Sequence, residues 1–503
     1  MSLSLLTAGA RFRLPSRWLP DVLQEATPAL RALVLVALAA GLFGLFASAL
    51  DAGVYVLLAP LALAVAALIL VRPEAGLALM FLTAPLETAY LEVGGFRVKP
   101  LQVIGLLTMA GLALQFAIGK REILRGSSLS KPLFLLVLTF LFSFAMHSQF
   151  VSMGIPLFIL QLWFIAVILL AANFVDEPEV LRRCFWTFIA AGVLEAALAV
   201  VQAAGFYETV SPLASYGSIL NQGRPAGTFT EPDFLAPFLV GSFLLILPFW
   251  GKKRVGAWTP VVYFVVPLLL AASMLSMVRA SWLGMFAGLA AFGWLKLRER
   301  GDRPDFGGWF KRMAGIAAAV AVIAMGLAVL WPAAFSTVSV RAKNMLTIVE
   351  PENPHATRLN EMTQTWNVIK ENPLIGHGVG TFSVSTKYGQ GVAATSGHRA
   401  GVVGAGTPLS LLHDQGVGGL LAFALVLGVL LWRLVRASRT AGAVSSPYVQ
   451  GVFACVVGLT ASACFNNLYY FGYYWLIIAL AAAFVEPLWP AGKRSEETLE
   501  TAR

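Results

Sequence analysis

The chain has 503 residues, of which 58% are hydrophobic and 12% are charged. A soluble globular domain carries about twice that share of charged residues, and a disordered chain carries far fewer apolar ones, so both classes are excluded. Because one membrane-spanning helix takes about 20 residues, this composition predicts an all-α membrane protein, a polytopic helical bundle of about 12–14 transmembrane helices with one large extracytoplasmic loop.

The predicted organisation follows the apolar runs in chain order. The first 29 residues carry Arg11, Arg13 and Arg17 without an apolar core, so we expect a cytoplasmic segment here and no cleavable signal. Five parts are predicted: an N-terminal cytoplasmic segment (1–29), an N-terminal transmembrane bundle (30–332), a large extracytoplasmic loop (333–410), C-terminal transmembrane helices (411–487) and a cytoplasmic tail (488–503).

The net charge of +10 is distributed unevenly over these parts. With the N-terminus in the cytoplasm, every cytoplasmic connection is basic, and about 26 of the 36 Lys and Arg residues lie on that side, as the positive-inside rule expects. The outer side is near neutral. The charge is therefore an orientation signal and a contact for anionic membrane lipids, with no nucleic-acid partner expected. We expect a multi-pass membrane protein with both termini cytoplasmic.

Two outer segments are long, from about Phe206 to Asp233 and from about Trp331 to Ser410. Long irregular segments in compact domains are usually functional. All five histidines lie on or at the edge of this outer side: His147, His355, His377, His398 and His413. The polar chemistry of the chain is therefore expected outside the cell.

Two arginines stand in outer segments beside predicted spans. Arg224 lies in the Gly- and Pro-rich turn Gly223–Phe229, and the following Thr230–Asp233 segment is predicted to cap a helix. Arg279 lies between two apolar runs with almost no loop, where an unpaired charge is costly. Each is either an anion-binding residue, because a guanidinium can grip phosphate with two donors, or half of a structural ion pair, with Glu231 as the partner of Arg224.

Two acids, Glu87 and Glu195, fall inside predicted spans. Each is either a proton relay or site acid, or a partner for a neighbouring helix. The three cysteines, Cys184, Cys455 and Cys464, lack the spacing of metal ligands, and no His or Asp spacing supplies it either. No metal site is therefore expected.

An amphipathic helix is predicted within the large outer loop, over Arg358–Glu371. One apolar stripe recurs there at helical spacing: Leu359, Met362, Trp366 and Ile369. We expect this stripe to pack on the membrane domain or to lie at the membrane interface. Arg358 and Glu361 lie off the stripe, three residues apart, and are spaced to pair.

Three alternating glycines, Gly376, Gly378 and Gly380, surround His377 just after this helix. The spacing predicts a close-approach turn, and without a strand–turn–helix context it does not indicate a nucleotide site. His377 is either a donor to the substrate or a structural residue of the turn.

Two further histidines are candidate general bases, because imidazole titrates near neutral pH. His398 lies in a Gly- and Ala-rich stretch, and His413 opens the next predicted span. Each of them also has a purely structural alternative. The chain carries no P-loop, no Ser-centred nucleophile elbow and no haem motif, so no cofactor is expected.

Four features, in their order along the chain, resemble the O-antigen ligase/O-antigen polymerase family of bacterial membrane glycosyltransferases. They are Gly223–Phe229 with Glu231–Asp233, the segment around Arg279, Arg358–Phe382, and Thr407–Gly416. The resemblance extends over residues 220–435, and the N-terminal half of the chain is similar only in general character.

The resemblance implies a reaction in the outer leaflet. A glycan carried on a polyprenyl diphosphate, such as undecaprenyl diphosphate, passes to a sugar hydroxyl of a glycan or glycolipid acceptor, as in lipopolysaccharide synthesis. No nucleotide, metal or other cofactor is implied. Arg224, Arg279 and Arg358 would hold the diphosphate. The site would be supported by Gly376, His377, Gly378, Gly380 and His413.

The sequence departs from the family pattern at one point. Ligases of the family usually place a His-Asn pair upstream of the glycine at Gly416, and here those positions are Ala405 and Gly406. The residues predicted to serve as general base are instead His398, Glu231 and Glu361. The departure leaves ligase and polymerase both open, and a non-enzymatic transporter or flippase of a lipid-linked glycan is the alternative function.

Overall fold

The computed structural model describes ten stretches of the chain and five single positions. The stretches are 54–93, 96–119, 127–147, 151–174, 177–203, 224–250, 259–299, 354–382, 406–440 and 446–486, and the single positions are 315, 318, 325, 326 and 329. The predicted cytoplasmic segments at 1–29 and 488–503 lie outside the described residues, so the boundaries of the five predicted parts stay predictions.

The chain forms two compact units. The described part of the smaller unit, 54–76 and 106–119, contains helix α3 (Val54–Val71), the start of α4 (Pro73–Thr83) and most of α5 (Pro100–Ala117). Within this unit α5 packs directly on α3. A Cβ added to Gly111 would lie only 2.8 Å from the carbonyl oxygen of Ile69, so the two backbones are in close contact.

The larger unit comprises residues 77–105 and 123–503. Its complete described helices are α6 (Ser130–Met146), α7 (Val151–Ala172), α8 (Pro178–Ala203), α11 (Pro232–Ile246), η3 (Leu247–Phe249), α12 (Thr259–Leu275), α13 (Arg279–Glu299), α16 (Pro354–Glu371), α19 (Thr407–Thr440), α20 (Ser446–Ala463), η5 (Leu468–Tyr470) and α21 (Gly472–Val485). A short antiparallel hairpin, β1 (Leu91–Val93) with β2 (Phe96–Val98), pairs Glu92 with Arg97.

The described helices have the length and composition of membrane spans. Seven of them are long and apolar enough to cross a membrane, and five shorter apolar helices accompany them. Several carry large exposed apolar side chains, such as Phe264 on α12 and Phe286 on α13, as expected of surfaces that face lipid. The predicted class, a polytopic helical membrane protein, is confirmed. The total of about 12–14 spans stays a prediction.

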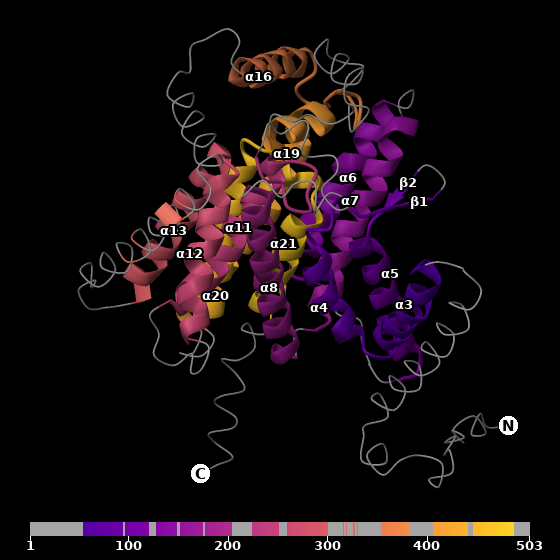
Figure 1. Cartoon of the computed structure of the whole chain (residues 1–503). Helices are drawn as coiled ribbons and strands as arrows, with labels where there is room; N and C mark the ends of the chain where they lie inside the picture. Colours follow the sequence, from indigo (N-terminus) through magenta and orange to yellow (C-terminus); the bar gives the residue numbers. More distant parts are fainter. Residues whose placement is uncertain are drawn as a thin grey trace, which may run out of the picture. The chain divides into compact units, whose positions relative to one another are not determined.

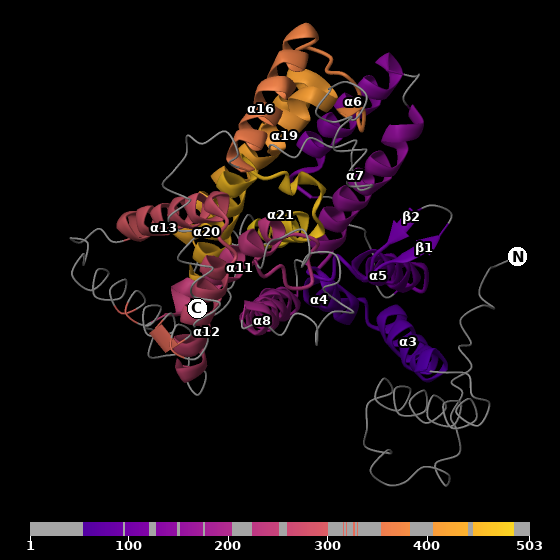
Figure 2. The same ribbon diagram turned by 45° about the horizontal axis from the view of Figure 1, so that its top comes forward.

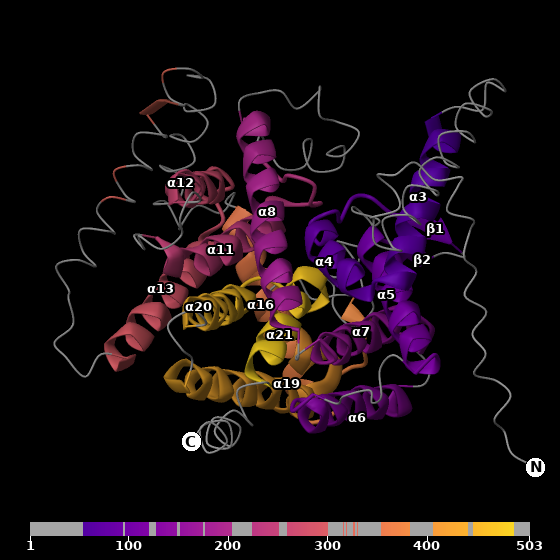
Figure 3. The same cartoon turned by 90° about the horizontal axis from the view of Figure 1, so that it is seen from below.

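Helices α11, α20 and α21 form the centre of the larger unit, enclosed by α8, α7, α19 and α13 (Figure 3). Nearly every residue of α11 and α21 is buried. Helix α13 approaches α20 closely through Gly284 and Gly288, a pair of small residues four apart. A Cβ on Gly284 would lie 2.5 Å from the carbonyl oxygen of Gly458, so these two helices touch along their backbones.

Successive helices of the larger unit run between two opposite ends (Figure 1). One end, which we call the site end, gathers six segments: 143–147, 224–233, 275–279, 372–382, 406–415 and 464–471. There Asn466 donates to the carbonyl oxygen of Asp233 (3.1 Å). At the opposite end Glu486 accepts from the N–H of Ser128 (2.5 Å). The alternation is that of a chain crossing a membrane repeatedly.

The apolar run 75–91, which contains Glu87 and was predicted to form a span, is helical only over its first half. Helix α4 ends at Thr83, and a turn follows it that leads into the β1–β2 hairpin. Pro85 explains the end, because the residue before a proline is disfavoured in the helical conformation. Glu87 lies in this turn and forms an ion pair with Lys99, just before α5, so the prediction that it lies inside a span is wrong.

Candidate functional site

The turn that carries Arg224 is attached to the end of α8 by the buried amide of Gln202. Its Oε1 accepts hydrogen bonds from the N–H groups of Ala226 (3.1 Å) and Gly227 (2.8 Å). Its Nε2 donates to the carbonyl oxygen of Gly227 (3.1 Å). One side chain of a predicted span therefore satisfies three backbone groups of the turn, as buried polar groups require.

Glu195, two helical turns deeper in α8, holds the next residue of the same turn. Its carboxylate accepts from both the N–H (3.0 Å) and the hydroxyl (2.6 Å) of Thr228. Gly227 has a φ of 60°, and a Cβ at this position would collide with the Glu195 carboxylate, so only glycine fits here. Glu195 therefore partners a turn and not the neighbouring helix that was predicted.

Arg224 forms an ion pair with Asp233. The partner that the sequence had suggested for an ion pair was Glu231. Its Nη2 lies 2.8 Å from Asp233 Oδ1, and its Nε donates to the carbonyl oxygen of Ser276 (2.8 Å). Helix α11 begins at Pro232, a favoured first position, which leaves the exposed Glu231 as the N-cap residue and turns Asp233 toward the arginine. These contacts use two of five guanidinium donors, and the side chain is 24% exposed.

Arg279 is the first residue of α13 and follows the turn that Arg224 binds. Met277, in this turn, has a φ of 58°, which is uncommon for a residue with a side chain and marks a tight change of direction. A cation at a helix N-terminus is electrostatically unfavourable, because the macrodipole is positive there. The dipole of α13 therefore does not account for an arginine at this position.

The two arginines and two helix N-termini meet at one part of the site end, formed by residues 224–233 and 276–279, which we call the arginine corner. Helices α11 and α13 both begin here. The first N–H groups of a helix have no partner within the helix and attract anions such as phosphate. The corner thus holds two arginines and two helix N-termini beside the carboxylates of Glu231 and Asp233, and Asp233 already accepts from one guanidinium nitrogen of Arg224.

A second polar cluster forms where α19 is broken at Gly416, which has a φ of 67° and a ψ of −165°. In a regular helix the N–H of Val417 would donate to the carbonyl oxygen of His413. Here Val417 donates instead to Pro373 (2.8 Å), and His413 accepts from the N–H of His377 (2.7 Å). The turn after α16 is thus inserted into the hydrogen-bond ladder of α19.

The glycines predicted to form a close-approach turn do so. Gly376, Gly378 and Gly380 have φ values of 81°, 97° and 77°. A Cβ on Gly376 would lie 2.7 Å from the backbone nitrogen of Gly416, so the backbones of the turn and of the α19 break are in direct contact. Helix α16 lies beside the first part of α19 as a result (Figure 2).

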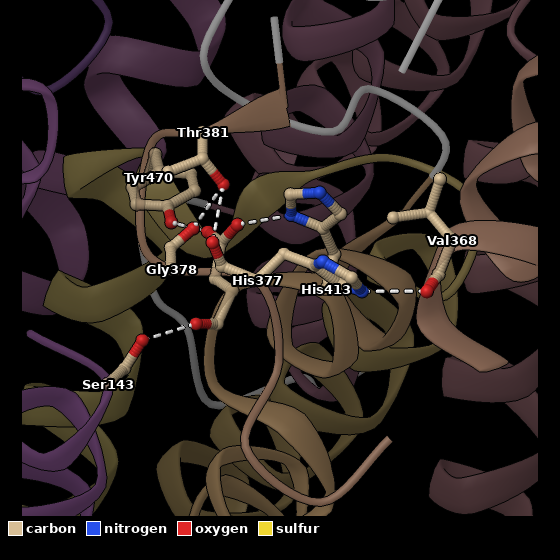
Figure 4. Close-up of polar contacts among 8 residues, drawn as sticks. Ser143, Val368, His377, Gly378, Thr381, His413 and Tyr470 are labelled. Carbon is tan, nitrogen blue, oxygen red and sulfur yellow. Dashed lines mark hydrogen bonds and ion pairs between the residues drawn. The ribbon is translucent and has the colours of Figure 1, made fainter. Parts of the chain in front are cut away.

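The inserted turn brings His377 onto His413 (Figure 4). The two rings stack with centroids 5.6 Å apart and planes 27° apart. His413 is fully buried, and its Nδ1 lies 2.8 Å from Asp414 Oδ1. The hydroxyl of Tyr470 donates to Asp414 Oδ2 (2.8 Å), and Ser143 donates to the Asp414 carbonyl oxygen (2.6 Å). The network joins α6, α19 and η5.

The loop between α20 and α21, residues 464–471, connects the arginine corner to this network. Asn466 donates to Asp233, which pairs with Arg224, and accepts at its own carbonyl oxygen from the hydroxyl of Thr407 at the start of α19 (3.4 Å). Four residues later Tyr470 reaches Asp414. Both clusters therefore belong to one continuous polar region at the site end.

The predicted helix of the outer loop is confirmed and begins earlier, at Pro354. Its buried face differs from the predicted stripe: Ile369 is buried, but Trp366 is 48% exposed and Glu361 is only 7% exposed. Contact with α19 and the following turn decides this face, as shown by Met362 packing on Phe382. The charged residue Glu361 therefore points inward, where hydropathy alone predicts a solvent-facing position.

The remaining predicted residues are distributed as follows. Arg358 lies in the first half of α16, and Glu231 is exposed at the start of α11. His398, together with the Gly389–Ala405 stretch around it, lies outside the described residues. The roles of all three as diphosphate-binding residue or general base stay predictions.

Four polar residues of the two clusters were missed by the sequence reasoning: Ser143, Gln202, Asn466 and Tyr470. Gln202 carried a usable signal, because it is a lone amide near the end of an apolar run. The dense Asn and Tyr content of Asn466–Tyr474, between two predicted spans, was a second signal. Ser143 carried none, since serines are common in membrane helices.

No group of three or more His, Cys, Asp or Glu side chains in the described part of the chain could hold a metal ion. Residues 264–401, which include α12, α13, α16 and the glycine turn, match a protein family model described as O-antigen ligase. A search among curated proteins found no match.

Proposed function

We propose, for this chain as a member of the O-antigen ligase family, a glycosyl transfer from a polyprenyl-diphosphate carrier to an acceptor sugar hydroxyl on the outer face of the bacterial plasma membrane. The family match supports glycosyltransferase activity and a lipid-linked donor in general terms. The arginine corner is the observation that carries the proposal. Its arginines and helix N-termini face the same end of a membrane-spanning bundle.

The reaction requires a departing diphosphate to be stabilised. The acceptor oxygen attacks the anomeric carbon, the bond from that carbon to the diphosphate oxygen breaks, and the electron pair leaves with the polyprenyl diphosphate. Arg224 and Arg279 would neutralise the charge that grows on this oxygen, which is the kind of preorganised stabilisation that lowers barriers most. Arg358 is proposed as a third diphosphate contact.

The acceptor hydroxyl must also lose a proton, which a positioned general base takes up. The predicted candidates are His398, Glu231 and Glu361. A glycan or glycolipid acceptor would approach from the outer side, so the glycine turn with His377 and His413 would support the same site. The proposal needs neither a nucleotide nor a metal.

Replacing Arg279 with Ala tests the proposed diphosphate site. Membranes from a deletion strain that expresses the variant would be supplied with the lipid-linked glycan that the deletion strain accumulates. We expect turnover to fall by about 100-fold or more, as in the loss of other transition-state donors. The matched control is Arg298→Ala at the opposite end of α13, where Arg298 lies over the ring of Trp294, 4.4 Å from its centroid. Full activity of Arg279→Ala would refute the site.

Ligase and polymerase activities are distinguished by the glycan that changes on gene deletion. Unattached glycan of normal chain length would identify a ligase, whereas single repeat units on the carrier would identify a polymerase. The transporter alternative predicts movement of the lipid-linked glycan across proteoliposome membranes with no new glycosidic bond. The strong outward bias of the polar residues favours the enzyme, since transporters place such groups near the centre of the membrane.

A further inference from the structure

His377 is held at three points by different segments. Its ring Nε2 lies 2.7 Å from the carbonyl oxygen of Val368 in α16, and its backbone N–H donates to His413 in α19 (2.7 Å). Its own carbonyl oxygen accepts from the hydroxyl of Thr381 (3.0 Å). The flat face of the ring rests on His413.

These contacts determine where the ring carries its proton. A carbonyl oxygen can only accept, so Nε2 must bear the hydrogen, and the neutral ring keeps its lone pair on Nδ1. Burial lowers the pKa of His377 below its usual value, and the neighbouring His413 and His147 lower it further, against the opposing charge of Glu371. Asp414 is the other charged group close by, through His413. The neutral form therefore prevails near pH 7.

We propose that His377 accepts the proton of the attacking acceptor hydroxyl at Nδ1, and that Asp414 is a positioning residue that acts through His413. The proposal rests on the glycosyl transfer proposed above. As the acceptor oxygen bonds to the anomeric carbon, its proton passes to His377 Nδ1, and the electron pair of the broken bond leaves on the diphosphate. The proton then returns to water.

Asp414 suits a positioning role because its carboxylate is fully engaged and buried. One carboxylate oxygen lies 2.8 Å from His413 Nδ1, and the other accepts a hydrogen bond of 2.8 Å from the Tyr470 hydroxyl. Only 1% of the residue is exposed. Burial and the neighbouring Asp414 charge raise the pKa of Tyr470, which keeps it protonated as the donor. The ring of His413, on which His377 stacks, is thereby held in place by residues of α19 and η5.

The test compares His377→Gln with Arg298→Ala in the same membrane assay, using lipid-linked glycan extracted from the deletion strain. Gln can still donate to the Val368 carbonyl oxygen but offers no basic nitrogen. We expect kcat to fall by about 100-fold or more, with KM for the lipid-linked glycan changed less than about threefold. Arg298 lies over the ring of Trp294 at the opposite end of α13, far from the proposed base, and Arg298→Ala should retain activity.

The pH profile adds a readout that a structural role would not produce. Neutral His377 is the active form, so the rate should fall as the pH drops through its lowered pKa, below the usual histidine range. This acid limb should be absent in His377→Gln. It should persist in Asp414→Asn and in the milder Tyr470→Phe, which lower kcat about tenfold or less at every pH because the base remains but is misplaced.

The outcomes separate the two proposals. A His377→Gln protein that keeps more than half of the wild-type kcat and the acid limb overturns the role of His377. If Arg279→Ala loses activity in the same experiment, the proposed function nevertheless stands. If both variants keep full activity, the proposed function fails as well. Normal amounts of folded protein in the membrane, measured for each variant, exclude a loss through misfolding.

Discussion

At the scale of single residues, some side chains are the acceptors on which buried donors depend. Glu195 is the clearest case. Two donors of Thr228 share its carboxylate, and both are buried. Replacing Glu195 with Leu would leave them unsatisfied, which costs about 1–3 kcal/mol for each group.

We therefore expect Glu195→Leu to lower the thermal unfolding temperature of the detergent-solubilised protein and to raise KM for the lipid-linked glycan, because the Arg224 turn loses its support. The control is Leu194→Ala, one residue away and 63% exposed on the same helix. Unfolding at the wild-type temperature in Glu195→Leu would show that Thr228 does not need this partner.

The residues that sequence could predict are those whose chemistry conflicts with their surroundings. Arg224 and Arg279 are charged residues beside apolar runs. In the structure the turn that contains Arg224 is joined to the turn that leads into Arg279 by the hydrogen bond from Arg224 to Ser276. The partner of Arg224 was predicted wrongly, because Glu231 and Asp233 are equivalent in composition and only the start of α11 at Pro232 decides between them. Contacts such as Tyr470 to Asp414 join residues 56 positions apart, and no local pattern encodes them.

At the scale of elements, the break in α19 and the turn after α16 depend on each other. Gly416→Ala would disfavour the φ of 67° and would favour a regular helix, in which Val417 bonds to His413 again. The carbonyl oxygen of Pro373 and the N–H of His377 would then lose their partners.

For Gly416→Ala we expect release of α16, seen as faster proteolysis between residues 354 and 382, together with loss of turnover. Gly428→Ala, on the same helix with open space around its Cβ position, is the control and should be as stable as the wild type or more so. A Gly416→Ala protein with wild-type protection and turnover would contradict the proposed dependence.

The helices themselves were predictable where length and hydropathy agree, as in α8, α19 and α20. The buried face of α16 was not predictable. The stripe of Leu359, Met362, Trp366 and Ile369 identifies the apolar residues of the helix but not the segments that the helix packs against. Packing on α19 turned Glu361 inward and left Trp366 exposed. A short helix that packs on other protein segments follows its neighbours more than its own periodicity.

At the scale of the whole molecule, a native cysteine can report the orientation. Cys464 is exposed at the site end, whereas Cys184 and Cys455 are buried. A membrane-impermeant maleimide should label Cys464 in spheroplasts and not in inverted vesicles. Partial burial raises the pKa of the Cys464 thiol, so labelling should be faster at pH 9 than at pH 7, because the thiolate is the reacting form.

The Cys464→Ser variant controls for reaction at the other two thiols. Labelling of Cys464 in inverted vesicles alone would place the site end in the cytoplasm and would overturn the predicted orientation. The class of the molecule was predictable from composition, since 58% hydrophobic residues fit only a membrane bundle. How α11, α20 and α21 come to its centre was not, because their apolar residues are compatible with contact to lipid or to protein.

The interrupted ladder of α19 also bears on how the chain is assembled during synthesis. Unpaired backbone groups are not tolerated in lipid, so the interrupted helix needs the Pro373–His377 turn before its polar groups can enter the bilayer. The turn precedes α19 in the chain and leaves the ribosome first. With the predicted orientation, in which residues 333–410 are extracytoplasmic, export of this segment would have to precede the insertion of α19, and slow export would delay that insertion.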